Sequence, residues 1–342
     1  MLEHGGRLRE ASEQYGVALA GWLDLSTGLA PWSWPVPPIP VSAWTRLPEA
    51  EDGLEQAARE FYGAAGALPV AGSQAAIQAL PRLRAPCRVA IIGPCYAEHQ
   101  RAWERAGHQV RVLSVEQCSA LLGSPEAPEL DVLVLVNPDN PTGRLLDRQT
   151  LLDWHAALSA TGGWLVVDEA FADPDPAQSL TAFCQRPGLI VLRSIGKFFG
   201  LAGIRLGFVF APAPLLAELN DLLGPWAVSG PARVVGQAVL TDLPRHQQQR
   251  QRLAEASTRL QSLLSQHGLS AAGGCALFQW VTTTEVQRLH QRFAERGILL
   301  RLYRAPLGLR IGLPGDEAAW QRLDSTLNEV MQIMEQSPLC QP

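Results

Sequence analysis

The stretch "DVLVLVNPDNPTGRLLDRQTLLDWHAALSATGGWLVVDEAF", residues 131–171, contains two apolar runs with a longer amphipathic run between them. The apolar runs "DVLVLV" (131–136) and "WLVVD" (164–168) are short and rich in valine and leucine, which is typical of buried strands. The run "DRQTLLDWHAALSATG" has the length and the pattern of a helix. Strands that alternate with helices indicate a mostly parallel sheet that is covered on both faces.

The same alternation continues on either side of this stretch. Short apolar runs predict further strands at 88–92, 189–193 and 206–210, and "YAEHQRAWERAG" predicts a helix after the first of them. The fold class that we expect is therefore α/β, with a large domain built on a mostly parallel sheet and covered by helices.

The pattern changes in the C-terminal third of the chain. A long amphipathic helix is predicted at 245–268, and three strands follow it in "ALFQWVT", "ILLRL" and "GLRIGL". The proline-rich segment 30–40 cannot form a regular helix or a central strand, so we expect a connector there. These features predict an N-terminal segment with its connector at 1–45, a large domain at 46–215 and a smaller α+β domain at 216–342.

The composition narrows the class of protein. The chain has 342 residues, of which 47% are hydrophobic and 18% are charged, as in ordinary globular proteins. Its net charge of −5 and the lack of a basic run argue against nucleic-acid binding. No apolar stretch approaches a membrane span, and "MLEHGGRLRE" lacks a signal-peptide core, so we expect a cytoplasmic protein. The six cysteines include no C-x-x-C pair, which favours reduced thiols and argues against a metal site.

Lys197 lies in "VLRSIGKFFGLAGIRLGF" (191–208) and is the only lysine among the 28 basic residues. Arginine and lysine both supply positive charge, but only the lysine amine can lose its proton and attack a carbonyl. A codon bias would explain why lysine is rare, but not why it stands between Gly196 and two phenylalanines. Ser194 and Arg205 carry the groups that bind a phosphate, so Lys197 is expected beside an anion site.

Three other segments carry polar groups near predicted strand ends, where ligands bind in open α/β sheets. "VNPDNPTG" (136–143) predicts a tight turn that can aim an asparagine at a ligand, although such turns also occur without a function. Asp168 ends a hydrophobic strand, where it needs a donating partner or else caps the next element. "AGSQAAI" (71–77) offers N–H groups to an anion. Pyridoxal phosphate is the cofactor that requires a lysine, a carboxylate, an asparagine and an anion site together.

Several motifs resemble those of the fold-type I aminotransferases, in particular the histidinol-phosphate aminotransferase branch. They are "NPDNPTG", "DEAF" and the pattern S-I-G-K-(7)-R-L-G, and the similarity extends from residue 4 to about residue 330. The segments "HGGRLREAS" (4–12), "VLRSIGKFF" (191–199) and "PWAVSGPA" (225–232) are most similar to the decarboxylases of this branch. The resemblance implies a large domain that binds pyridoxal 5'-phosphate and a smaller α+β domain.

The resemblance also implies roles for individual residues. Lys197 would form the internal aldimine with the cofactor, Asp168 would pair with the pyridinium nitrogen and Tyr96 would stack on the ring, and these three would be the catalytic residues. Asn140 would donate to the phenolic oxygen. The cofactor phosphate would be held by Gly72, Ser73, Gln74, Ser194 and Arg205.

Substrate contacts are implied near both ends of the chain. Arg310 matches the arginine that binds the substrate carboxylate, and His4 with the Gly5 and Gly6 backbone would lie near a substrate phosphate. The implied activity is decarboxylation of a phosphorylated amino acid, O-phospho-L-threonine, to (R)-1-amino-2-propanol phosphate for cobalamin biosynthesis. The alternative is transamination of histidinol phosphate at the same cofactor site. A cofactor-binding module without catalysis would not explain the lysine, the aspartate and the arginine.

Some positions depart from the family pattern. Phe171 stands where many aminotransferases have tyrosine, and Leu47 replaces the tyrosine that usually reaches the cofactor phosphate of the partner subunit. "STGLAP" (26–31) lacks two asparagines of the branch. The family implies a homodimer, and Trp226 would border the site. The other histidines have no metal-ligand spacing and are expected at surface or helix positions: His99, His108, His155, His246, His267 and His290.

Overall fold

The computed structural model describes residues 5–123 and 130–336, which divide into two compact units. Unit 1 consists of 1–32, 141–143 and 251–342, and unit 2 consists of 33–140 and 144–250. These limits differ from the domain limits expected at 45 and 215. The difference arises because α9 (Ala213–Leu223) and α10 (Gly230–Thr241) pack on α4 (Ser73–Ala79) and α3 (Leu54–Tyr62) of unit 2.

Unit 2 is built on a seven-stranded sheet in the order β2-β8-β7-β6-β5-β3-β4. All pairs from β7 to β4 are parallel, whereas β8 is antiparallel to both of its neighbours. The expected α/β class with a mostly parallel sheet is therefore confirmed. The strands are β2 (Leu68–Val70), β3 (Arg88–Ile92), β4 (Gln109–Leu113), β5 (Val132–Val136), β6 (Trp164–Asp168), β7 (Leu189–Ser194) and β8 (Gly207–Phe210).

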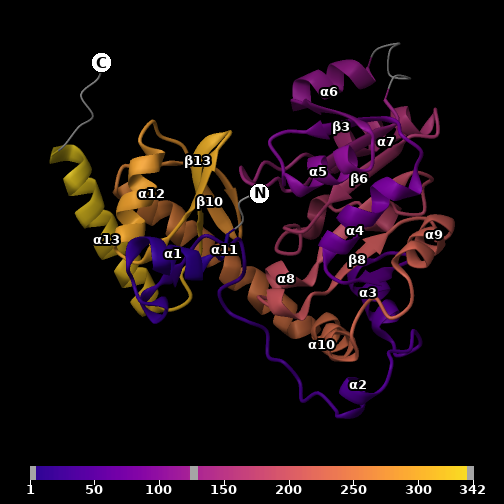
Figure 1. Ribbon diagram of the computed structural model, residues 1–342, viewed down its shortest axis with the longest axis horizontal. Coiled ribbons are helices and arrows are strands. Elements are labelled where there is room, and N and C mark those ends of the chain that lie inside the picture. Colours follow the sequence, from indigo (N-terminus) through magenta and orange to yellow (C-terminus); the bar gives the residue numbers. More distant parts are fainter. Residues whose placement is uncertain (1–4, 124–129, 337–342) are drawn as a thin grey trace. The chain divides into compact units, whose positions relative to one another are not determined.

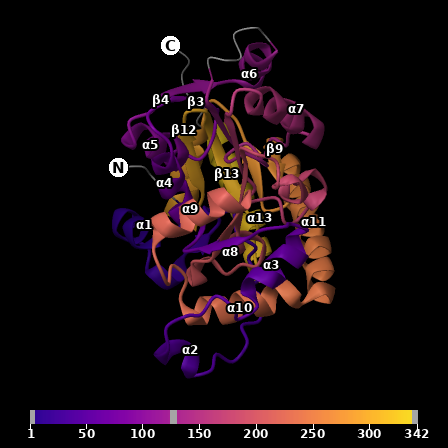
Figure 2. The same ribbon diagram turned by 90° about the vertical axis from the view of Figure 1, so that its right-hand side faces the viewer.

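The central strands are apolar because helices cover them. Every residue of β5 and β7 is buried, as expected for strands with both faces covered. Helix α4 packs against β7 and β8, and α3 lies beside α10 (Figures 1 and 2).

No helix among the described residues is long and apolar enough to cross a membrane. The other helices of unit 2 are α2 (Ser42–Thr45), α5 (Glu98–Arg105), α6 (Val115–Leu122), α7 (Arg148–Ser159) and α8 (Ile195–Phe198), with 3₁₀ turns η2 (Leu80–Leu83), η4 (Pro176–Gln178), η5 (Thr181–Phe183) and η6 (Ala202–Ile204).

Unit 1 joins segments from the two ends of the chain. Its antiparallel sheet has the order β12-β13-β10-β9, and a second, parallel pair joins β1 to β11. Helix α1 lies beside α12 (Figure 1), so the N-terminal segment folds with C-terminal elements. Strands β10 and β13 fall in predicted runs, whereas "ILLRL" contributes to two strands, β11 and β12. The elements are α1 (Leu8–Tyr15), η1 (Leu19–Gly21), β1 (Leu23–Asp24), β9 (Ala271–Cys275), β10 (Phe278–Val281), α12 (Val286–Glu295), β11 (Ile298–Leu299), β12 (Arg301–Arg304), β13 (Leu307–Gly312) and α13 (Glu317–Gln336), while α11 (Leu243–Gln266) contains the division at 250.

Candidate active site

Lys197 lies where strand β7 leads directly into the short helix α8. Its Nζ is 5.5 Å from the centroid of the Phe171 ring, which is almost completely buried. The face of an aromatic ring attracts a cation, so this contact has cation–π geometry. The residue that departs from the family tyrosine is thus a direct neighbour of the lysine.

Asp168 ends β6, the neighbouring parallel strand, and is buried. Its Oδ2 lies 2.9 Å from His99 Nε2, and its Oδ1 accepts the Ala170 N–H at 3.0 Å. The sequence left open whether this carboxylate has a donating partner or caps the next element; it accepts from the Ala170 N–H two residues along and also from the His99 side chain. Because a carboxylate only accepts, Nε2 is the donor of this bond.

His99 lies in a helix, α5, as expected, but only 1% of it is exposed and it binds Asp168. His155 and His246 also lie in helices and are buried. His108 contradicts the expectation of a surface or helix position, because it is buried and precedes β4 outside any helix. His99 follows Tyr96 by three residues, its N–H donates to Tyr96 O at 3.0 Å and the two ring centroids are 6.3 Å apart, so the turn that leads into α5 places Tyr96 beside the partner of Asp168. That spacing is the signal that sequence reasoning missed.

Gln74 is held by its neighbours in a way that changes its expected role. Its Oε1 accepts the Tyr96 hydroxyl at 3.2 Å, and its Nε2 donates to Glu98 Oε2 at 3.3 Å. Gln78 Nε2 also donates to Glu98, at 3.2 Å. The Gln74 amide therefore orients the Tyr96 ring, and a contact from Gln74 to a phosphate would come from its backbone N–H.

Close backbone packing brings the other expected phosphate residues together. Gly72 has a φ of +71°, and a Cβ atom at this position would overlap the Arg205 guanidinium. A Cβ atom on Gly207 would lie 2.6 Å from the Ser73 nitrogen, and Gly207 pairs with Ser194 across β8 and β7. Glycine is required where a side chain would fill such a space. Gly72, Ser73, Ser194 and Arg205 thus form a cradle lined by N–H, hydroxyl and guanidinium donors.

The two asparagines of "VNPDNPTG" have different positions. Asn137 Nδ2 donates to Leu146 O at 3.0 Å, and its Oδ1 accepts the Leu146 N–H at 2.8 Å, so this side chain closes the turn. Asp139 supports the same turn through an ion pair with Arg144 at 3.4 Å. Asn140, the residue expected to contact the cofactor, is buried at the end of the turn. Its ligand contact stays a prediction.

Arg310 belongs to unit 1, on strand β13, and is buried. Its Nη2 donates to Ser26 O at 2.8 Å, and burial lowers the pKa of its guanidinium. Arg301, which the sequence did not single out, stands directly opposite Arg310 in the β12–β13 pair. Like charges opposite each other on neighbouring strands repel, so an anion bound there would relieve the repulsion.

The N-terminal glycines meet the same part of unit 1 through Ser26. Gly6 N–H donates to Ser26 Oγ at 2.8 Å, and Ser26 Oγ donates to Asp24 Oδ1 at 2.6 Å. A Cβ atom on Gly5 would lie 2.5 Å from Ser26 O, the oxygen that binds Arg310. Gly5, Gly6 and Arg310 are therefore brought together, whereas His4 lies outside the described residues.

A lysine and an aspartate lie at or just beyond the ends of adjacent parallel strands, the edge at which ligands bind in open α/β sheets. Their contacts with a cofactor stay a prediction. The family model for aminotransferase class I and II matches residues 45–323. The chain belongs to this family, which confirms the resemblance stated from the motifs.

Individual relatives show which members of this family the chain is similar to. The chain is 57% identical over 327 residues to a protein from Pseudomonas aeruginosa named threonine-phosphate decarboxylase, covering 96% of this chain and 97% of the relative. It is 43% identical to a protein of the same name from a Sinorhizobium species, covering 95% and 97%. A solved structure, histidinol-phosphate aminotransferase from Sinorhizobium meliloti in complex with pyridoxal-5'-phosphate, matches with a TM-score of 0.80 at 21% identity, over 97% of this chain and 96% of that chain.

Proposed function

We propose that this chain is a pyridoxal-phosphate-dependent decarboxylase that converts O-phospho-L-threonine to (R)-1-amino-2-propanol phosphate and carbon dioxide, for cobalamin biosynthesis. The observation that carries the proposal is the 57% identity to a threonine-phosphate decarboxylase over 96% of the chain. Both expected groups, the amine of Lys197 and the carboxylate of Asp168, stand at neighbouring strand ends in unit 2.

The residues present fit pyridoxal phosphate. The cradle of Gly72, Ser73, Ser194 and Arg205 brings together the donors that a phosphate needs, because Gly72 has no Cβ atom and lets the Arg205 guanidinium approach its backbone closely. When bound, this cofactor supplies an aldehyde that condenses with an amine and a protonated ring that accepts the electron pair of a broken bond. Asp168 would hold the ring proton, and Asn140 would donate to the phenolic oxygen.

The protein residues divide the chemical work. His99 fixes the orientation of the Asp168 carboxylate, which would pair with the ring nitrogen of the cofactor. Lys197 would hold the cofactor, and its Nζ would carry a proton once the substrate amine is bound. Loss of carbon dioxide leaves the substrate Cα in need of one proton, which Lys197 Nζ delivers. Tyr96, oriented by Gln74, would cover the ring.

The substrate anions require cations, and unit 1 supplies two. We assign Arg310 to the substrate carboxylate, and we add Arg301 as a second guanidinium for a doubly anionic substrate. Gly5, Gly6 and His4 are assigned to the phosphate end, and Ser26 aligns the two glycines with Arg310.

The test compares decarboxylation with the alternative reaction. Purified protein with the cofactor should show a visible absorbance band and should release carbon dioxide from O-phospho-L-threonine. Lys197→Ala should lose the band and lower kcat by about 10³-fold or more, as loss of a nucleophile does. A band without gas release, together with a half-reaction with glutamate, would instead support transamination of histidinol phosphate.

We further propose a homodimer, supported by an apolar hollow of about 600 Å³ in unit 2. Trp44, Leu47 and Trp226 line the hollow and are 66%, 63% and 58% exposed. Exposed apolar groups that gather in one place mark interaction surfaces. In light scattering, the double variant with Trp44→Glu and Leu47→Glu should be monomeric. The matched control Leu243→Glu changes an equally exposed leucine outside the hollow and should stay dimeric; a monomeric parent protein would refute the proposal.

A further inference from the structure

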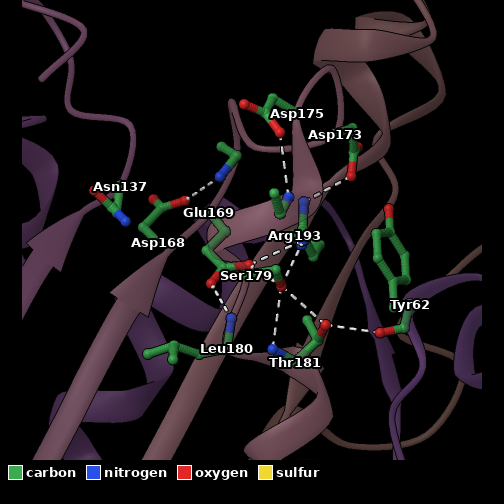
Figure 3. A network of polar contacts seen from close by, with 12 residues as sticks. Tyr62, Asn137, Asp168, Glu169, Asp173, Asp175, Ser179, Leu180, Thr181 and Arg193 are labelled. Carbon is green, nitrogen blue, oxygen red and sulfur yellow. Dashed lines mark hydrogen bonds and ion pairs between the residues drawn. The ribbon is translucent and has the colours of Figure 1, made fainter. Parts of the chain in front are cut away.

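A buried ion cluster lies next to the strand end that carries Asp168 (Figure 3). The Arg193 guanidinium pairs with Glu169 at 3.0 Å and with Asp173 at 2.7 Å, and the exposed fractions of these three side chains are only 1%, 1% and 2%. Burying charges is costly even when they are paired, so a cluster of this kind is poor evidence for added stability. None of its members has a place in the proposed chemistry.

Every member of the cluster is held in a defined orientation. Arg193 Nη2 donates to Ser179 Oγ at 2.8 Å, and Ser179 Oγ donates to Glu169 Oε2 at 2.7 Å. The other oxygen of Glu169 accepts the Leu180 N–H at 2.7 Å. The Tyr62 ring lies 4.9 Å from the guanidinium carbon of Arg193. Figure 3 shows Tyr62 on the side of Arg193 that faces away from Glu169. A small displacement of one group would therefore break several contacts at once.

The cluster joins two chain segments that meet at the candidate active site. Glu169 directly follows Asp168, and its N–H donates to Leu192 O at 2.9 Å, beside Arg193 on β7. Asp173 follows Phe171 by two residues, and the Phe171 ring lies against Lys197 Nζ. Arg193 thus holds both ends of segment 169–173, while Lys197 comes four residues after Arg193 on the same strand and helix.

The positions of Asp168 and Phe171 depend on this cation. Without Arg193, the carboxylates of Glu169 and Asp173 would be left buried without their counter-charge, and they would move apart or take up protons. Movement of the two carboxylates would shift segment 169–173. Asp168, which directly precedes the segment, and Phe171 within it would then move relative to Lys197.

We propose that Arg193 is a positioning residue for the proposed decarboxylation, acting through Glu169 on Asp168 and through Asp173 on Phe171. The inference rests on the proposed function, since it assigns to Arg193 the alignment of the lysine with its two neighbours. Arg193 does not touch the substrate or the reacting atoms.

The test compares Arg193→Met with Arg193→Lys and with a matched control. Arg233, on α10, also binds one aspartate and one glutamate in unit 2, Asp52 just before α3 and Glu55 within it, so Arg233→Met is the control. Each protein is prepared with the cofactor bound. The first measurement is the band midpoint, the pH at which the visible absorbance band of the bound cofactor has changed by half. The second is kcat and KM for O-phospho-L-threonine, determined separately.

Arg193→Met should move the band midpoint upward by about one pH unit, because a nearby positive charge has been removed. It should lower kcat by about 100-fold, the effect of a displacement of about 1 Å, and change KM by less than about threefold. Arg193→Lys should recover part of both changes, and Arg233→Met should match the parent protein. If Arg193→Met has the band midpoint and kcat of the parent within about twofold, the inference is wrong.

Asp173→Asn keeps the test decisive if Arg193→Met does not fold. It leaves one carboxylate for one guanidinium and loosens only the Phe171 end of the segment. A lower kcat with an altered band midpoint supports the inference, and parental values of both overturn it. The two proposals fail separately: a parent protein without a visible band refutes the proposed function, whereas a normal band that is indifferent to Arg193 and Asp173 refutes only the positioning role.

Discussion

Unit 2 contains two arginines that each bind one aspartate and one glutamate, yet the two clusters behave differently. Arg193 and its partners are buried, whereas Arg233 is 8% exposed and its partners Asp52 and Glu55 are 36% and 21% exposed. The distances are similar, 2.7 and 3.0 Å in one cluster and 2.6 and 2.8 Å in the other.

The pKa values of the two aspartates shift in opposite directions. Burial raises the pKa of Asp173 to about 6 although the charge of Arg193 opposes the shift. At Asp52, burial also acts to raise the pKa, but the hydrogen bonds and charge of Arg233 with the Leu54 N–H outweigh it, and the pKa is lowered. Since both aspartates pair with an arginine, the depth of burial, and not the identity of the partner, decides whether an ionised carboxylate stabilises the folded state.

The two clusters should differ most in the stability that is lost when the arginine is replaced. Arg193→Met should lower the free energy of unfolding by about 3–5 kcal/mol, because it leaves two buried carboxylates uncompensated. Arg233→Met should cost only about 2 kcal/mol, since water can solvate its partners. Urea unfolding of both variants measures the difference, and equal losses would mean that burial does not separate the two clusters.

The pH dependence should have opposite signs at the two aspartates. Asp173 has a raised pKa, so its contribution to stability is present below about pH 4 and is lost as the pH rises through about 6. Asp173→Asn should therefore gain about 3 kcal/mol relative to the parent protein between about pH 4 and pH 7.

Asp52 has a lowered pKa, so its contribution is present above its unfolded value of 3.8 and is lost on further acidification. Asp52→Asn should lose stability relative to the parent protein as the pH rises through that range, by a smaller amount because Asp52 is partly exposed. Denaturant unfolding over this pH series measures both slopes. Slopes of the same sign would contradict the role given to burial.

His99 tests a third carboxylate, Asp168, whose buried side-chain partner is an imidazole and not an arginine. His99→Phe keeps an aromatic ring but removes the donor, which should cost about 1–3 kcal/mol of stability. The visible band of bound cofactor should shift as well, because Asp168 would lose its orientation. His155→Phe is the control: that histidine is also buried on a helix, but its Nε2 lies 2.9 Å from Pro187 O, away from Asp168. An unchanged band in His99→Phe would mean that Ala170 alone orients Asp168.

The sequence by itself determined the class of fold and the chemical groups of the site. The predicted runs matched the bounds of β3 and β6 to the residue, because the buried interior of a parallel strand is apolar and a polar residue stands at one end of each run. The lone Lys197, the "DEAF" motif and the glycine at 72 could be read from local sequence, because each serves a local need for an amine, a strand-end carboxylate or a backbone without a side chain.

Only the tertiary structure decided which groups meet. His99 and Asp168 are 69 residues apart, and Arg233 and Asp52 are 181 residues apart, so no local pattern joins them. The Gln74 amide binds Tyr96 and Glu98 because the folded chain brings these side chains together. Residues 216–250 belong to unit 2 because their helices pack against it. The same holds for the charges, because composition counts an arginine with two acids in both clusters. The depth of burial that raises the pKa of Asp173, opposite to the shift at Asp52, exists only after folding.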